Sequence, residues 1–124
     1  MSNLSTREKD AHREAVSMSI ADVTKYLQDA FGQKLVAYMT DTKDAKNVGR
    51  WSRGEQAPRK DAEDRLRIAY QVFHLLQEKD SSHTVRAWFV GLNPQLGDES
   101  PATAIRDGRH RDVLIAAKAF LAGA

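Results

Sequence analysis

The most informative part of this sequence is the stretch Val48-Gly49-Arg50-Trp51-Ser52-Arg53-Gly54. On an α-helix, Val48 and Trp51 share one face because residues three apart are neighbours, so both can anchor a helix to a core. Gly54 follows as a helix stop, since glycine readily adopts the backbone conformation that ends helices. We therefore predict a helix over residues 44–53 that buries the valine and the tryptophan.

The other side of this helix carries side chains that suit nucleic acid. Asparagine and arginine form paired hydrogen bonds with adenine and guanine edges, and nearby basic residues can hold phosphates. Residues 43–60 contain six basic and two acidic side chains, a balance of +4 against +2 for the whole chain. The predicted DNA-binding residues are Lys43, Lys46, Asn47, Arg50, Arg53 and Arg59. The alternative is a solvated basic helix whose tryptophan serves only the core.

A second helix immediately before this one completes a helix-turn-helix. Leu35, Val36 and Met39 follow a helical period, and the polar run Thr40–Lys43 predicts a turn. In such a motif the first helix braces the backbone and the second enters the major groove. We therefore predict a helix-turn-helix over residues 35–54.

Helical periods continue through the rest of the chain. Further helices are predicted at about residues 19–31, 61–76, 82–90, 101–108 and 113–121. Ser19, Asp61 and Ser100 are the expected caps, and Pro101 suits the first position of its helix. No stretch alternates long enough to predict a strand. We expect an all-α fold of about six helices, preceded by a polar arm at residues 1–18 that is frayed or partly helical.

Composition argues against catalysis. The chain has 124 residues and no cysteine, which excludes disulfides, thiol catalysis and thiolate zinc sites. Its four histidines lack the spacing of a metal site, and it has neither a glycine-rich phosphate loop nor a nucleophile elbow. No apolar run is long enough for a membrane helix or a signal peptide. We expect a cytoplasmic protein that is not an enzyme and holds no metal or cofactor.

The C-terminal third contains a connected series of aromatic, turn and capping residues. The segments are Ala87-Trp88-Phe89, Asn93-Pro94-Gln95-Leu96-Gly97 and Ser100-Pro101. Trp88, Phe89 and Leu92 are expected to serve a core, and packing alone is the alternative to a binding role for Trp88. Arg106 and Arg109 belong to a basic cluster that either meets an acidic partner surface or is simply solvated. Small residues in the last helix allow another surface to approach closely.

These segments resemble a known family. The stretch from Val48 to Gly54 is similar to the end of the recognition helix in phage-repressor-like, Xre-type proteins. The customary turn glycine is replaced by Asp41 or Thr42, and the turn is one residue longer if Ala37 is the small packing residue. Together with the C-terminal segments, residues 19–124 resemble an Xre/MbcA/ParS-type antitoxin.

The resemblance implies a partner and a division of the chain. Residues 19–80 would form the helix-turn-helix domain with its linking helix, and residues 81–124 would bind a RES-domain toxin that consumes NAD. In this family the antitoxin obstructs the active site of the toxin and often represses its own operon. The expected toxin-binding residues are Trp88, Asn93, Pro94, Leu96, Arg106, Arg109, Lys118 and Ala124.

Two other functions stay open at this stage. One is a stand-alone helix-turn-helix repressor, and the other is a helical interaction module with no DNA role. A homodimer is expected for a DNA-binding protein of this kind, because operators are often palindromic.

Overall fold

The computed structural model describes residues 4–123, and this part of the chain is all-helical, as predicted. It contains the elements α1 (Leu4–Ser17), α2 (Ile20–Phe31), α3 (Gln33–Met39), α4 (Lys46–Ser52), α5 (Lys60–Gln77), α6 (Ser82–Val90), the 3₁₀ helix η1 (Pro94–Leu96), α7 (Pro101–Arg106) and α8 (His110–Leu121). Eight α-helices in the described residues exceed the six that were expected. None of the described helices is long and apolar enough to cross a membrane.

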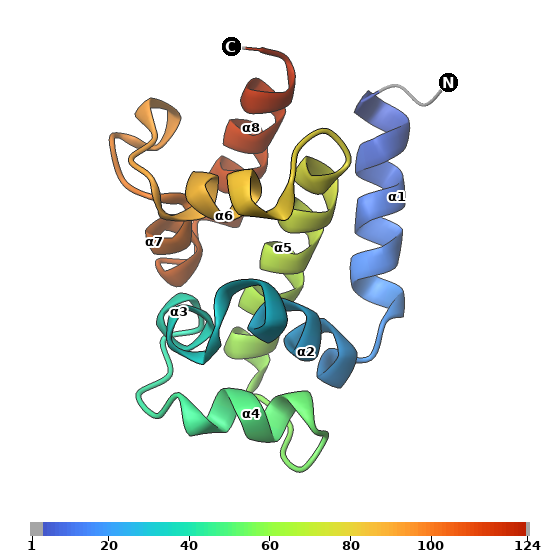
Figure 1. The fold of residues 1–124 in the computed structure, drawn as a ribbon, viewed down its shortest axis with the longest axis vertical. Helices are drawn as coiled ribbons and strands as arrows, with labels where there is room; N and C mark the ends of the chain where they lie inside the picture. The colour runs from blue at the N-terminus through green and yellow to red at the C-terminus, as the bar shows by residue number, and fades with distance from the viewer. Residues whose placement is uncertain (1–3, 124) are drawn as a thin grey trace.

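Helix α5 runs through the centre of the molecule (Figure 1). It packs against α1, α2 and α8, which approach it from different sides. Its buried residues therefore cover more than one face, including Leu66, Tyr70, Val72 and Leu75. A wide apolar stripe is the sequence signal of a helix that is surrounded in this way.

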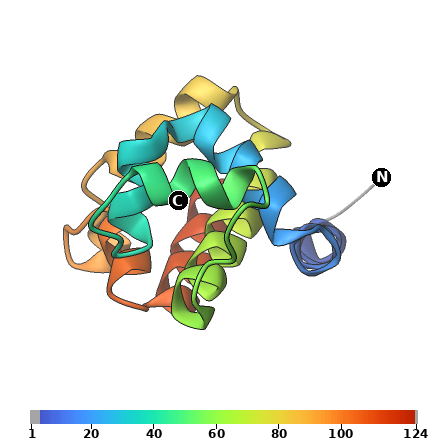
Figure 2. The same ribbon diagram turned by 90° about the horizontal axis from the view of Figure 1, so that it is seen from below.

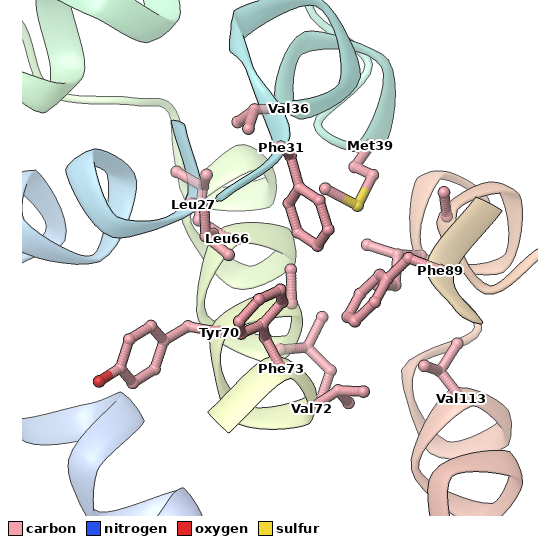
Figure 3. Packing of buried hydrophobic residues seen from close by; sticks show 14 of the residues in the cluster. Leu27, Phe31, Val36, Met39, Leu66, Tyr70, Val72, Phe73, Phe89 and Val113 are labelled. Atoms are coloured by element: carbon pink, nitrogen blue, oxygen red, sulfur yellow. The ribbon is translucent and has the colours of Figure 1, made fainter. Parts of the chain in front are cut away.

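Three phenylalanines join the N-terminal and C-terminal halves in one core. Phe31 of α2, Phe73 of α5 and Phe89 of α6 have ring centroids 4.8 to 6.1 Å apart (Figure 3). Phe73 and Phe89 are almost completely buried, and burying such a side chain contributes about 1.5–3 kcal/mol. Helix α2, the central helix α5 and the C-terminal helix α6 are therefore stabilised by the same contacts.

Residues 4–17, most of the expected frayed or partly helical arm, form the continuous helix α1. Ala11 and Ala15 of α1 are buried, one turn apart, in a helix that packs on α5. The Arg67 guanidinium donates to the carbonyl oxygens of Ala15 and Met18 at 2.7 and 3.0 Å, which ties the end of α1 to α5. Two alanines give too little apolar contrast to reveal this packing in the sequence.

Two of the three expected caps are present. The Ser19 and Ser100 hydroxyls each accept a hydrogen bond at 3.1 Å from the backbone amide three residues later, and Pro101 occupies the first turn of α7. The prediction for Asp61 is wrong, because the cap of α5 is Arg59 and makes no side-chain capping bond. Asp61 lies inside the first turn, where a carboxylate still complements the helix dipole.

Candidate DNA-binding surface and partner-binding groove

Helix α4 lies across one end of the molecule. It packs mainly against α2 and α3, and the view from below shows it in front of the other helices (Figure 2). Val48 and Trp51 are 0% and 3% exposed, so the apolar face is turned inward. Gly54 has a φ of +72°, the left-handed conformation expected of a residue that follows a helix.

The opposite face of α4 is polar. We call Lys43, Lys46, Asn47, Arg50 and Arg53 the α4 surface; all five are exposed or half-exposed. Arg50 Nη1 donates to Asn47 Oδ1 at 2.7 Å, so the two side chains best suited to base edges lie together. This contact is half-buried, and a ligand with donor and acceptor groups of its own can exchange with it.

Acidic neighbours reduce the charge of the basic segment. Arg53 pairs with Glu55, and this hydrogen bond lowers the pKa of the Glu55 carboxyl and raises the pKa of Arg53. Lys60 pairs with Asp64 at 2.6 Å. Within the described residues, Lys43 and Lys46 have no acidic partner within ion-pair distance. The charge available to a polyanion therefore comes chiefly from these two lysines and Arg50.

Arg59 supports the turn between α3 and α4. Its Nη2 donates to the carbonyl oxygens of Thr40 and Asp41 at 2.8 and 2.9 Å, and its Nε pairs with Asp61 at 2.9 Å. Asp41 has a φ of +56°, so it occupies the left-handed position where glycine is customary. Aspartate tolerates that conformation better than most residues. Arg59 was predicted to contact DNA, and these bonds hold it beside the turn instead of on the α4 surface.

A second surface lies in the C-terminal third. A groove with a volume of about 280 Å³ opens between α6, the η1 segment and α8. We call it the C-terminal groove; its lining is mostly apolar and consists of Trp88, Leu92, Asn93, Pro94, Gln95, Ala116, Ala119 and Phe120. Leu92 is 79% exposed, the most of any large apolar side chain in the described residues. The expectation that Leu92 serves the core is therefore wrong.

Three of the residues predicted to bind a toxin line this groove: Trp88, Asn93 and Pro94. Trp88 is half-buried and packs edge-on against Phe89, with centroids 5.4 Å apart, so one side serves the core. Asn93 is held by its own turn, because its side chain accepts from the Gln95 amide at 2.9 Å. The rim of the groove is thus fixed by local bonds and by core contacts.

The remaining predicted contacts have other surroundings. Leu96 is 1% exposed and lies in the core. Lys118 pairs with Glu8 of α1 at 2.9 Å, and Arg109 pairs with Asp112 at 3.0 Å. Arg106 donates to the carbonyl oxygen of Tyr38 in α3, and Ala124 lies outside the described residues.

Sequence reasoning missed five of the groove residues: Leu92, Gln95, Ala116, Ala119 and Phe120. The small residues of the last helix were the available signal, because alanines at positions 116 and 119 leave room for the hollow. Phe120 of the same helix also lines the groove and is half-exposed.

His110 is a half-buried titratable residue that lies outside both surfaces. His110 Nε2 has no hydrogen-bond partner in the described part of the chain. Desolvation by burial lowers the pKa of His110, and the nearby Arg65 charge lowers it further against the opposing effect of Asp64. Among residues 4–123, no three histidine or acidic side chains are grouped to hold a metal ion.

In comparisons with known proteins, no family model, no curated protein and no solved structure matches this chain.

Proposed function

We propose that this protein is an antitoxin of the Xre/MbcA/ParS kind, which binds and inhibits a RES-domain, NAD-consuming toxin and represses its own operon. The observation that supports it best is that one chain carries two chemically different surfaces: the basic α4 surface and the apolar C-terminal groove. The two lie toward different ends of the molecule (Figure 1). A protein that binds DNA and another protein at once needs such a separation.

The C-terminal groove suits a protein partner. A single exposed leucine is common on protein surfaces and does not by itself indicate a binding site. Leu92, however, lies beside a hollow lined with aromatic and small side chains, where it can contact an apolar side chain of a partner protein. Binding energy at protein interfaces concentrates in such central apolar contacts. In the proposed complex the groove and its rim cover the entrance to the toxin's active site and exclude NAD, while this chain performs no chemistry itself.

The α4 surface suits operator DNA. Asn47 and Arg50 are hydrogen-bonded to each other on the polar face of α4, and Lys43 and Lys46 add positive charge nearby in the sequence. In a symmetric dimer, two such helices would enter successive major grooves of a palindromic operator. We therefore assign base recognition to Asn47 and Arg50, and phosphate contact to the two lysines.

The test is co-expression with the product of the adjacent gene, followed by size-exclusion chromatography. We expect the two proteins to elute together and the toxicity of the partner to disappear. Leu92→Asp should abolish both effects, whereas Val16→Asp places the same charge at an exposed apolar residue of α1 and should change neither. Separate elution of the wild-type pair, or undiminished toxicity, would refute the antitoxin function.

A stand-alone repressor is the second candidate, and the intact α4 surface favours it independently of the groove. It requires only sequence-specific binding to the chain's own promoter. That binding should weaken as salt rises, because lysine and arginine contacts to phosphate release counterions. Equal affinity for promoter and unrelated DNA would exclude both operator-binding proposals.

A further inference from the structure

A residue of the C-terminal region holds the turn of the helix-turn-helix. Arg106, the last residue of α7, donates from Nη1 to the carbonyl oxygen of Tyr38 at 2.8 Å, and its Nη2 lies 2.7 Å from Asp41 Oδ1. The same guanidinium lies 4.7 Å from the centroid of the Tyr38 ring. The Tyr38 hydroxyl is in turn 2.8 Å from Thr103 Oγ1 of α7. Four contacts therefore connect α7 to the end of α3 and to the turn that follows it.

The turn needs such support for two reasons. The last carbonyl groups of a helix lack partners within it, and cations near that end are favourable. Asp41 also holds a backbone conformation that most residues avoid. Arg106 and Arg59 both contact this point, one from α7 and the other from the start of α5. Two guanidinium groups from outside α3 and α4 thus add to the local hydrogen bonds that hold the chain between these helices.

We propose that the contact of Arg106 with Asp41 and Tyr38 positions the recognition helix, so that the C-terminal region controls the conformation in which α4 meets DNA. Arg106 acts here as a positioning residue. Helix α7 packs against α6 and α8, which line the C-terminal groove, so a partner in the groove can act on α4 through this contact. The DNA-binding consequence rests on the proposed function, but the effect on the turn does not.

Hydrogen exchange tests the effect on the turn without DNA. The Thr42 and Asp41 amides donate to the carbonyl oxygens of Ala37 and Tyr38 at 2.9 and 3.2 Å and report on the turn. We expect Arg106→Gln to raise their exchange rates about five- to tenfold, as for the loss of a partly exposed charged hydrogen bond. Arg109→Gln is the matched control, because both arginines have side chains 36% exposed and paired with acids. Unchanged exchange in Arg106→Gln, or an equal change in the control, would overturn the proposal.

Promoter affinity in a double-mutant cycle provides the second measurement. Asn tolerates the left-handed conformation, so Asp41→Asn removes the charge while keeping the turn. We expect Arg106→Gln and Asp41→Asn each to weaken promoter binding about five-fold, and the double variant to weaken it no further. Fully additive losses would overturn the role of this contact in DNA binding. If the wild-type chain binds no DNA, the proposed operator function fails, and the exchange measurement still decides whether Arg106 holds the turn.

Discussion

The α4 surface and the C-terminal groove are built in different ways. The α4 surface comes from one seven-residue helix and the residues directly before and after it, and its polar side chains are exposed or half-exposed. The groove is assembled from α6, η1 and α8, and its floor is continuous with the core. A charged surface on a short helix can be altered without loss of stability, whereas a groove depends on the fold beneath it. The expected effects below follow from this contrast.

The largest effect is expected where the two regions share their core. Phe73→Ala should lower the free energy of unfolding by about 3–5 kcal/mol, because it leaves a cavity between α2 and α6. The chain's two tryptophans report on each region separately, Trp51 in α4 and Trp88 in α6. Each tryptophan can be followed alone in a variant whose other tryptophan is replaced by phenylalanine. In urea unfolding, the two single-tryptophan variants should have the same midpoint, and Phe73→Ala should shift both midpoints by the same amount. Two separate midpoints would show that the two regions unfold independently. If the Phe73→Ala variant does not fold, Phe73→Leu provides a smaller destabilisation for the same measurement.

Two leucines four residues apart distinguish the core beneath the C-terminal groove from the rim of the groove. Leu96→Ala should cost about 2–5 kcal/mol of stability, because the side chain is fully buried. Leu92→Ala should change stability by less than about 0.5 kcal/mol, because Leu92 faces solvent. Chemical denaturation of both variants measures the difference, and equal losses would contradict the assignment of Leu92 to the rim.

On the α4 surface, substitutions should affect DNA binding and leave folding intact. Arg50→Ala should weaken promoter binding by about 1–3 kcal/mol through loss of a base contact. Glu55→Gln should strengthen it, because Arg53 then loses its acidic partner and the surface becomes more positive. Arg13→Ala, at an exposed residue of α1, serves as the control. Fluorescence anisotropy at several salt concentrations measures all three, and weaker binding by Glu55→Gln would contradict the role given to Arg53.

The smallest effect concerns His110, which belongs to neither surface. Its pKa is lowered in the folded chain from the ordinary value of 6.5, chiefly by burial. Just below pH 6.5 the unfolded chain therefore binds more protons than the folded chain, so the free energy of unfolding falls as the pH falls through this window. Above it, His110 is neutral in both states and contributes no slope. His110→Gln should remove this part of the pH dependence, and a steeper slope in the variant would show that the sign is wrong.

The sequence predicts the α4 surface better than the groove, and the reason is physical. One helical period places Val48 inward and Arg50 outward without knowledge of any other element. Leu92 and Leu96 are alike in sequence terms, and only the packing of η1 on α8 decides which is buried. Long-range polar contacts are hidden in the same way. Nothing near Arg106 in the sequence indicates that it reaches a turn more than sixty residues earlier.

The central claim is that the C-terminal groove holds a toxin inactive, and NAD consumption by the purified toxin measures this directly. The wild-type chain and the control Val16→Asp should stop NAD consumption at stoichiometric amounts. Leu92→Asp should leave the toxin active while folding as stably as the wild type, because Leu92 is 79% exposed. Full inhibition by Leu92→Asp, or no inhibition by the wild-type chain, would contradict the claim.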